Sequence, residues 1–144
     1  MQTDETDKAL LALLKENARA PVATLARRLG LARTTVQARL ERLETTGVIK
    51  GYTLRLDEGM RSPIRATALL SIEPRSAPAV LARLSSLPGV RVVHTASGRW
   101  DLVVGLEAET TADLDDTLDR IGESKGVRSS ESLIHLSTKL DRRG

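Results

Sequence analysis

The chain has 144 residues and a formal net charge of +3, from 22 lysines and arginines against 19 aspartates and glutamates. It contains no cysteine, which excludes disulfides, thiolate metal sites and cysteine catalysis, and no apolar run of about 18 residues, which excludes a transmembrane helix. The polar, acidic start lacks the basic and apolar regions of a signal peptide, so we expect a cytoplasmic protein.

The N-terminal part of the chain is expected to begin with two helices. Leucines that share one helical face predict a first helix from about Asp4 to Ala18, with Thr3 or Asp4 as its N-cap. A second helix is expected from about Val22 to Leu29, with Pro21 at its start, where the missing N–H costs no hydrogen bond. Gly30 then stands where the chain must leave this helix, a position that favours a positive φ.

A third helix is expected from Arg33 to Thr46. Its apolar residues recur in steps of four and three at Val36, Leu40 and Leu43, so they share one face. A short helix, a glycine turn and a second helix with a polar free face form a helix-turn-helix, whose second helix enters the major groove of DNA.

The basic side chains are concentrated in this region. From Arg19 to Arg55 there are eight basic and two acidic residues, a net charge of +6. From Arg61 to the end there are twelve basic and eleven acidic residues, a net charge of +1. This distribution is typical of a surface that binds DNA phosphates. The alternative is that the arginines only solvate the surface.

The first turn of the third helix carries the side chains that we expect to contact DNA bases. They are Arg33, Thr34, Thr35 and Gln37. The start of a recognition helix reaches base edges, where arginine can bond guanine and glutamine can bond adenine. Ala38, on the exposed face, could contact a thymine methyl. For each of these residues the alternative is a solvated side chain.

Three further arginines are candidates for phosphate contacts. Arg39 and Arg42 lie farther along the third helix and to its side. Either they contact phosphates or they form ion pairs within the unit, for instance Arg39 with Glu41 or Glu44. Arg28 either anchors the DNA backbone or has no such role.

The segment after the third helix is β-prone. Val48-Ile49 and Tyr52–Leu56 are separated by a glycine and predict a two-stranded wing. Lys50 and Arg55 suit phosphate contacts there, or the hairpin covers the open side of the helical core, and both can hold. Residues 57–63 are charged, contain glycine and proline and lack periodicity, so they predict a linker.

The second half of the chain alternates strand and helix patterns. The order is β-α-β-β-α-β, the ferredoxin-like motif, and its expected elements are strands at 65–72, 90–97, 100–107 and 127–138, with helices at 77–87 and from Thr110 or Thr111 to Ser124. Ser76 is the expected cap of the first of these helices. Two helices on one side of four strands leave the other sheet face open, a candidate dimer surface.

These elements predict an α+β protein of two domains. Residues 1–56 form a winged helix-turn-helix, residues 57–63 a linker, and residues 64–144 a ferredoxin-like domain.

With both halves in view, the sequence resembles the Lrp/AsnC (leucine-responsive, feast/famine) transcription regulators over nearly its whole length. The motifs that carry the resemblance are Thr3-Asp4-x-x-Asp7-x-x-Leu10-Leu11, Leu25-Ala26-x-x-Leu29-Gly30-Leu31, Val36-x-x-Arg39-x-x-x-Leu43-Glu44, Gly47-Val48-Ile49-x-Gly51-Tyr52 and Ser97-Gly98-Arg99-Trp100-Asp101. No single motif is specific, but their order and spacing together are. Where the family usually has a capping serine, this chain has Pro21 and Ala32, which cannot accept a capping bond through their side chains.

The resemblance implies a C-terminal "regulation of amino-acid metabolism" (RAM) domain. Such domains dimerise through their sheets and commonly assemble to octamers. Amino acids or related metabolites bind between RAM domains and alter DNA binding or assembly. We therefore expect double-stranded DNA, a small effector and further copies of the chain as partners, with no cofactor and no membrane.

The resemblance also implies where the effector binds. Asp101 would bond the α-amino group, and the backbone from Gly98 through Arg99 to Trp100 would meet the α-carboxylate. The alternatives are that Asp101 caps the hairpin turn and that Trp100 packs at a subunit interface. On the last strand, the resemblance places three residues near the response region, where they line the pocket or serve only the sheet: Leu133, Ile134 and His135.

No pattern in the chain predicts catalysis or a metal site. The two histidines, His94 and His135, are not placed together by the predicted elements, and no phosphate-binding loop or nucleophile motif is present. We expect a sequence-specific transcription regulator that responds to an amino acid or related metabolite, and not an enzyme. The alternative is a small-molecule-sensing subunit of a metabolic enzyme that does not bind DNA.

Overall fold

The computed structural model describes residues 2–60 and 64–143. The chain divides into two compact units, Met1–Arg55 with Arg142–Gly144, and Leu56–Asp141. We call them the helical unit and the sheet unit and describe each by itself. Within the described ranges, no helix combines the length and the apolar character needed to cross a membrane.

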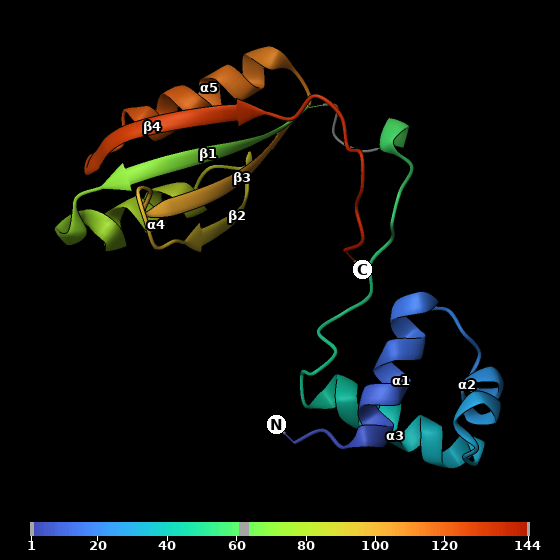
Figure 1. The fold of residues 1–144 in the computed structure, drawn as a ribbon. Helices are drawn as coiled ribbons and strands as arrows, with labels where there is room; N and C mark the ends of the chain where they lie inside the picture. Colours follow the sequence, from blue (N-terminus) through green and yellow to red (C-terminus); the bar gives the residue numbers. More distant parts are fainter. Residues whose placement is uncertain (1, 61–63, 144) are drawn as a thin grey trace. The chain divides into compact units, whose positions relative to one another are not determined.

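Three helices build the helical unit: α1 (Glu5–Glu16), α2 (Val22–Leu29) and α3 (Arg33–Thr45) (Figure 1). All three predicted helices are confirmed, with ends that differ by at most two residues. Their apolar faces meet in a small core made of Leu10, Leu14, Leu25, Ala26, Val36 and Leu43. Each large side chain buried there stabilises the unit by about 1.5–3 kcal/mol.

The turn between α2 and α3 has the geometry expected of a helix-turn-helix. Gly30 adopts φ 67°, which a side chain would disfavour, and the N–H of Leu31 donates to the carbonyl of Ala26 at 3.0 Å. Ala26 is buried, and its small side chain allows α2 and α3 to approach each other closely.

The three helix starts differ in how they are capped. Asp4 caps α1: its carboxylate accepts from the N–H of Asp7, and the side chain of Asp7 accepts from the N–H of Asp4. Pro21 and Ala32 occupy the N-cap positions of α2 and α3, and neither makes a side-chain bond, as the sequence indicated. A side-chain cap contributes about 1 kcal/mol, so α3 begins without that stabilisation.

The predicted wing is wrong. None of residues 48–56, all of which the structure describes, lies in a strand. Val48 and Ile49 instead pack against the helical core, and the N–H of Ile49 donates to the carbonyl of Leu43 at 2.9 Å. Because this half of the expected hairpin closes the end of α3, the β-prone Tyr52–Leu56 has no partner strand within the unit. A lone hairpin is marginal in water even when both strands are present.

Part of the predicted linker is also structured. Glu58–Met60 forms a short 3-10 turn. The rest of the predicted linker, residues 61–63, lies outside the described residues.

The sheet unit has the predicted βαββαβ order. Its elements are β1 (Ile64–Ile72), α4 (Ala77–Ser85), β2 (Val90–Thr95), β3 (Leu102–Ala108), α5 (Thr111–Gly122) and β4 (Val127–Ile134). The strands form one antiparallel sheet in the order β2-β3-β1-β4, with the hairpin of β2 and β3 as expected. The ferredoxin-like topology is therefore confirmed.

Two details of the sheet unit differ from the prediction. Ser76 stands at the N-cap position of α4 as expected, but its side chain makes no capping bond, because the 3-10 turn Pro74–Ser76 gives it a helical backbone. The strand β4 ends at Ile134 rather than near Thr138. By contrast, Thr110 caps α5 as expected, accepting from the N–H of Asp113 at 3.1 Å.

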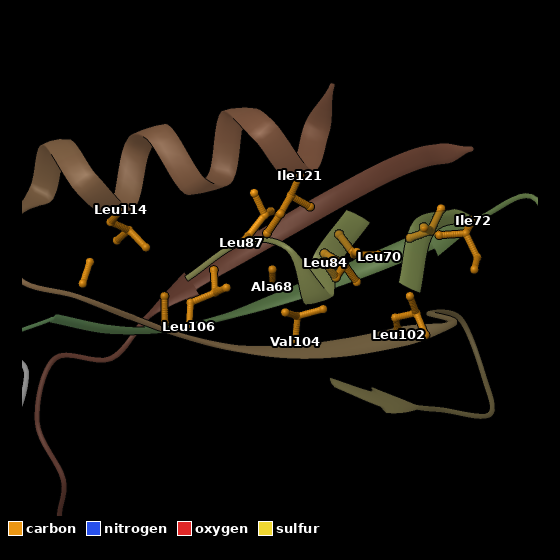
Figure 2. Close-up of a cluster of buried hydrophobic side chains, with 13 residues drawn as sticks. Ala68, Leu70, Ile72, Leu84, Leu87, Leu102, Val104, Leu106, Leu114 and Ile121 are labelled. Atoms are coloured by element: carbon orange, nitrogen blue, oxygen red, sulfur yellow. The ribbon is translucent and has the colours of Figure 1, made fainter. Parts of the chain in front are cut away.

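A single apolar core lies between the sheet and its two helices. Alternate residues of β1 and β3 point towards α4 and α5, where Leu84, Leu114 and Ile121 meet them (Figure 2). The opposite face of the sheet carries Val92 and Leu133, which are 44% and 50% exposed. No helix described in this unit packs on that face, so its apolar side chains remain in contact with solvent.

Candidate nucleic-acid and effector sites

The first turn of α3 presents the predicted base-reading residues to solvent. Arg33 is the first residue of the helix, and its side chain, like those of Thr34, Thr35 and Gln37, is exposed. Ala38 is exposed as well. A guanidinium, an amide and two hydroxyls therefore share one end of one helix, and all of these groups can hydrogen-bond base edges or phosphates.

Arg39 and Arg42, farther along α3, bind carboxylates of α1. Arg39 Nη1 donates to both oxygens of Asp4, at 2.9 and 2.7 Å, and to Oδ1 of Asp7 at 3.0 Å. Arg42 Nη2 donates to Oδ2 of Asp7 at 2.7 Å. We call these four residues the acid–arginine cluster.

Asp7 lies at the centre of the acid–arginine cluster. It is 0% exposed and is the only buried charged residue among those the structure describes. Each of its two oxygens is bound by a different arginine, so its charge is compensated. The hydrogen bonds that the Arg39 guanidinium donates to Asp4, and then to Asp7, raise its pKa above the usual range.

The cluster shows Arg39 in one of the two roles that the sequence left open, and it does not test the other, a phosphate contact. Arg39 forms an ion pair within the helical unit, but the expected partners Glu41 and Glu44 are wrong. The actual partners lie 32 and 35 residues away in the sequence. The sequence predicts only a capping role for Asp4 and no separate role for Asp7. A signal was present, because an aspartate pair and an arginine pair each have i, i+3 spacing, which puts each pair on one helix face.

The remaining DNA candidates are at the surface. Arg28 Nη1 lies 3.6 Å from Oε2 of Glu16, and both side chains are more than half exposed. Lys50 is exposed in the segment that follows α3. Nearby, a hollow of about 260 Å³ is lined by Ala18, Arg19 and residues 52–54, and it coincides with neither predicted site.

In the sheet unit, the carboxylate of Asp101 holds the end of β1. Its Oδ2 accepts from the N–H of Ile72 at 2.9 Å, and its own N–H donates to the carbonyl of Leu70 at 2.8 Å. The β1–β3 pairing ends at Leu70 and Leu102, so Asp101 continues the bonding beyond the ladder. This differs from the predicted hairpin cap, because the acceptor serves β1 rather than the turn. The other carboxylate oxygen makes no bond to a described residue.

The turn before Asp101 is open to solvent. Gly98 has φ 114°, and the Arg99 guanidinium lies 5.5 Å from the centre of the Trp100 ring, a cation–π distance. Trp100 is partly buried and Arg99 is exposed. The turn therefore offers a cation, a ring face and backbone groups side by side.

The second group of predicted effector residues lies elsewhere on the sheet. Leu133 pairs with Thr67, Ile134 pairs with Ala66, and Nε2 of His135 is 2.8 Å from Oγ1 of Thr67. These partners are at the start of β1, whereas Asp101 bonds its end. Five residues of strand span about 17 Å, so within one chain the two groups do not meet.

Comparison with known proteins gives a consistent result for both units. The model of the AsnC-type helix-turn-helix domain matches residues 4–44, and that of the Lrp/AsnC ligand binding domain matches residues 65–144. The HTH-type transcriptional regulator LysM of Saccharolobus solfataricus is 30% identical over 136 residues, which cover 94% of each chain.

Solved structures share the fold. The Escherichia coli AsnC structure aligns with a TM-score of 0.86 at 23% identity, covering 99% of this chain and 98% of that one. A transcriptional regulator from Neisseria meningitidis, solved as an L-Met complex, aligns with a TM-score of 0.84 at 23% identity, covering 97% and 94%. These matches do not favour the alternative of an enzyme subunit that lacks DNA binding. The chain belongs to the Lrp/AsnC family of helix-turn-helix transcriptional regulators.

Proposed function

We propose that this regulator reads DNA sequence with the first turn of α3, and that an amino acid or related metabolite bound by the sheet unit modulates that reading. The observation that carries the proposal is that the polar side chains at the start of α3 are free for DNA, whereas the arginines farther along are ion-paired. Arg33, Thr34, Thr35 and Gln37 are exposed, whereas Arg39 and Arg42 are bound to carboxylates of the same unit.

The phosphate contacts then come from basic residues outside the acid–arginine cluster. Cations whose charge is already compensated release few counterions when DNA binds. Between Arg19 and Arg55, the exposed cations outside the cluster, besides Arg33, are Arg19, Arg27, Arg28, Lys50 and Arg55. On binding DNA, Arg28 would give up its 3.6 Å ion pair with Glu16 and pair with a DNA phosphate instead. The duplex lies in the cytoplasm, where we expect the protein to act.

Replacing Arg33 tests the base-reading proposal. A duplex selected by the wild-type chain from a random-sequence pool serves as the target, and Arg33→Ala is expected to relax preference at one base position by about 1–3 kcal/mol. Arg65→Ala, in the sheet unit, is the control and should keep the preference. An unchanged base preference in Arg33→Ala would count against the assignment.

For the effector, we propose that Asp101 and the Gly98–Trp100 turn bind the amino-acid backbone. The match to a ligand-binding domain and the unbonded second oxygen of Asp101 support this. The likeness to the L-Met complex supports an amino acid as ligand class. Because Leu133–His135 lies at the far end of β1, both groups would join one site only if a second copy supplies one of them.

A thermal-shift screen of the amino acids tests this part of the proposal, since a ligand that binds the folded state raises the Tm. In Asp101→Asn, an amide oxygen can still accept from Ile72, but the charge that would bind an ammonium is lost. The shift should disappear while DNA binding without effector remains. Glu123→Gln makes the same charge change at an exposed helix end and should keep the shift. A retained shift in Asp101→Asn would remove this residue from the site.

We further propose that a second copy covers the open sheet face, giving a homodimer that assembles further, up to the octamer that the family implies. Val92 and Leu133 supply the exposed apolar area on that face. Leu133→Lys should lower the sedimentation coefficient at micromolar concentration. A monomeric wild-type chain would contradict the proposal.

A further inference from the structure

We propose that Asp7, together with Asp4, acts as a positioning residue for DNA recognition, because the acid–arginine cluster sets the rotation of α3 about its own axis. The inference rests on the proposed DNA-reading role of the first turn of α3. Neither aspartate needs to touch DNA. Their effect reaches the bases through Arg39, Arg42 and the backbone of α3.

The contacts of the acid–arginine cluster fix the rotation of α3 about its axis as well as its distance from the start of α1. Asp7 binds Arg39 through Oδ1 at 3.0 Å and Arg42 through Oδ2 at 2.7 Å, and the two arginines lie three residues apart on α3. Asp4 adds a third attachment, to Arg39 at 2.7 Å. A carboxylate that binds two points on neighbouring turns resists rotation of the helix, because charge-assisted hydrogen bonds are strongly directional.

The apolar contacts of α3 cannot supply the same restraint. Only Val36 and Leu43 are fully buried on this helix, and burial of apolar area is non-directional. The side chains packed around these two are all aliphatic, so none of their contacts is directional. The directional side-chain contacts that join α3 to the start of α1 are those of the acid–arginine cluster, and the bond from the N–H of Ile49 to the carbonyl of Leu43 holds only the C-terminal end of α3.

A small rotation would be enough to disturb base reading. A side chain on the rim of a helix about 10–12 Å wide moves about 2 Å when the helix turns by about 20°. Hydrogen bonds to bases tolerate only a few tenths of an ångström. Arg33 and Gln37, six and two residues before Arg39, would therefore lose their geometry while the helical unit stays folded.

The experiment measures selectivity rather than affinity alone. Binding of the full chain is measured for two duplexes: one selected by the wild-type chain from a random pool, and one with the same bases scrambled. Asp7→Asn and Asp4→Asn each remove one negative charge from the cluster. Glu5→Gln is the matched control, because it removes a charge from the same helix end, where Glu5 is 91% exposed and binds only Lys8 among the described residues.

All three variants should bind the scrambled duplex slightly better, because each makes the basic unit more positive. The ratio of the two affinities should fall about tenfold in Asp7→Asn and about threefold in Asp4→Asn, the range expected when a coupling residue outside the contact surface is changed. The ratio should not change in Glu5→Gln. A loss of stability without a change in orientation would leave this ratio constant in every folded sample.

Each outcome bears on the inference. Amide NMR spectra taken at the measuring temperature identify the folded variants. If Asp7→Asn does not fold, Asp4→Asn carries the test, because asparagine still caps α1. A wild-type ratio in a folded cluster variant, or an equal loss in Glu5→Gln, would overturn the inference. If the wild-type chain selects no sequence at all, the proposed base-reading function itself fails, which is a different result.

Discussion

The helical unit and the sheet unit hold their parts in place by different means. Among the residues that the structure describes, the sheet unit packs thirteen buried apolar residues between four strands and two helices, whereas the helical unit has six. The smaller core is supplemented by the acid–arginine cluster, with Asp7 wholly buried. A smaller core leaves α3 less restrained by packing alone, so directional ion pairs have more to contribute there. Substitutions in each unit can test this contrast.

Truncation of the larger core should give the largest effect. Leu70 is fully buried at the centre of β1, and Leu70→Ala should lower the free energy of unfolding of the sheet unit by about 2–5 kcal/mol. Trp100, the only tryptophan, lies in this unit, so its fluorescence in a urea titration of the full chain reports the change. Leu136→Ala, at a side chain that is 95% exposed, should leave the same transition in place. An unshifted transition in Leu70→Ala would contradict the described core.

Neutralising the buried carboxylate of Asp7 should lower the stability of the helical unit. Asp7→Asn weakens two charge-assisted hydrogen bonds, but Arg39 and Arg42 are 26% and 53% exposed and can be partly rehydrated. We expect a loss of about 2 kcal/mol in the free energy of unfolding of the helical unit. Amide signals of α1–α3 followed in urea should shift to lower midpoints, while the Trp100 transition stays the same. Equal shifts in both units would mean that the cluster does not act locally.

Supplying the missing cap of α3 should stabilise the helical unit. Ala32 already has the extended backbone of an N-cap, with φ −70° and ψ 149°, so Ala32→Ser should add about 1 kcal/mol. The same exchange at Ala38, in the exposed middle of α3, should instead lower the free energy of unfolding by about 0.5 kcal/mol. Both are read from the urea midpoint of the helical unit. Stabilisation by both exchanges would point to a cause other than capping.

Low pH should modestly lower the stability of the helical unit. The hydrogen bond from Arg39, and then the backbone N–H of Asp7, lower the pKa of Asp4 below its ordinary value of 3.8. A carboxyl with a lowered folded pKa stabilises the fold above its unfolded pKa and loses that contribution as pH falls through the folded value. Midpoints of the helical unit should therefore decline below pH 3.8, and less so in Asp4→Asn. Identical pH profiles for the two proteins would remove Asp4 from this role.

The fold followed from the sequence wherever the signal was periodic and local. Val36, Leu40 and Leu43 identified α3, because their spacing reports on burial within a single element. The wing failed for a related reason. The alternation of Tyr52 and Leu54 suits a strand, but whether Val48 pairs with it or seals α3 depends on tertiary packing that no local pattern encodes.

The sites were harder to predict than the fold, because their key contacts join residues that are distant in sequence. The exposure of Arg33 and Gln37 followed from their place at the start of a helix whose apolar residues share one face and whose free face is polar. The partners of Arg39 did not, since Asp4 comes near only when α1 packs on α3. The bond from Ile72 to Asp101 likewise depends on the sheet order β3-β1, which is known only once the strands are paired.

Equilibrium binding of the full chain to the selected and scrambled duplexes, over a range of salt concentrations, tests whether the start of α3 reads DNA sequence on a basic unit. A basic unit that neutralises several phosphates should lose affinity steeply for both duplexes as salt rises. Base contacts from the start of α3 should keep the selected duplex tighter at every concentration. Affinities that do not respond to salt, or that are equal for the two duplexes throughout, would contradict the account.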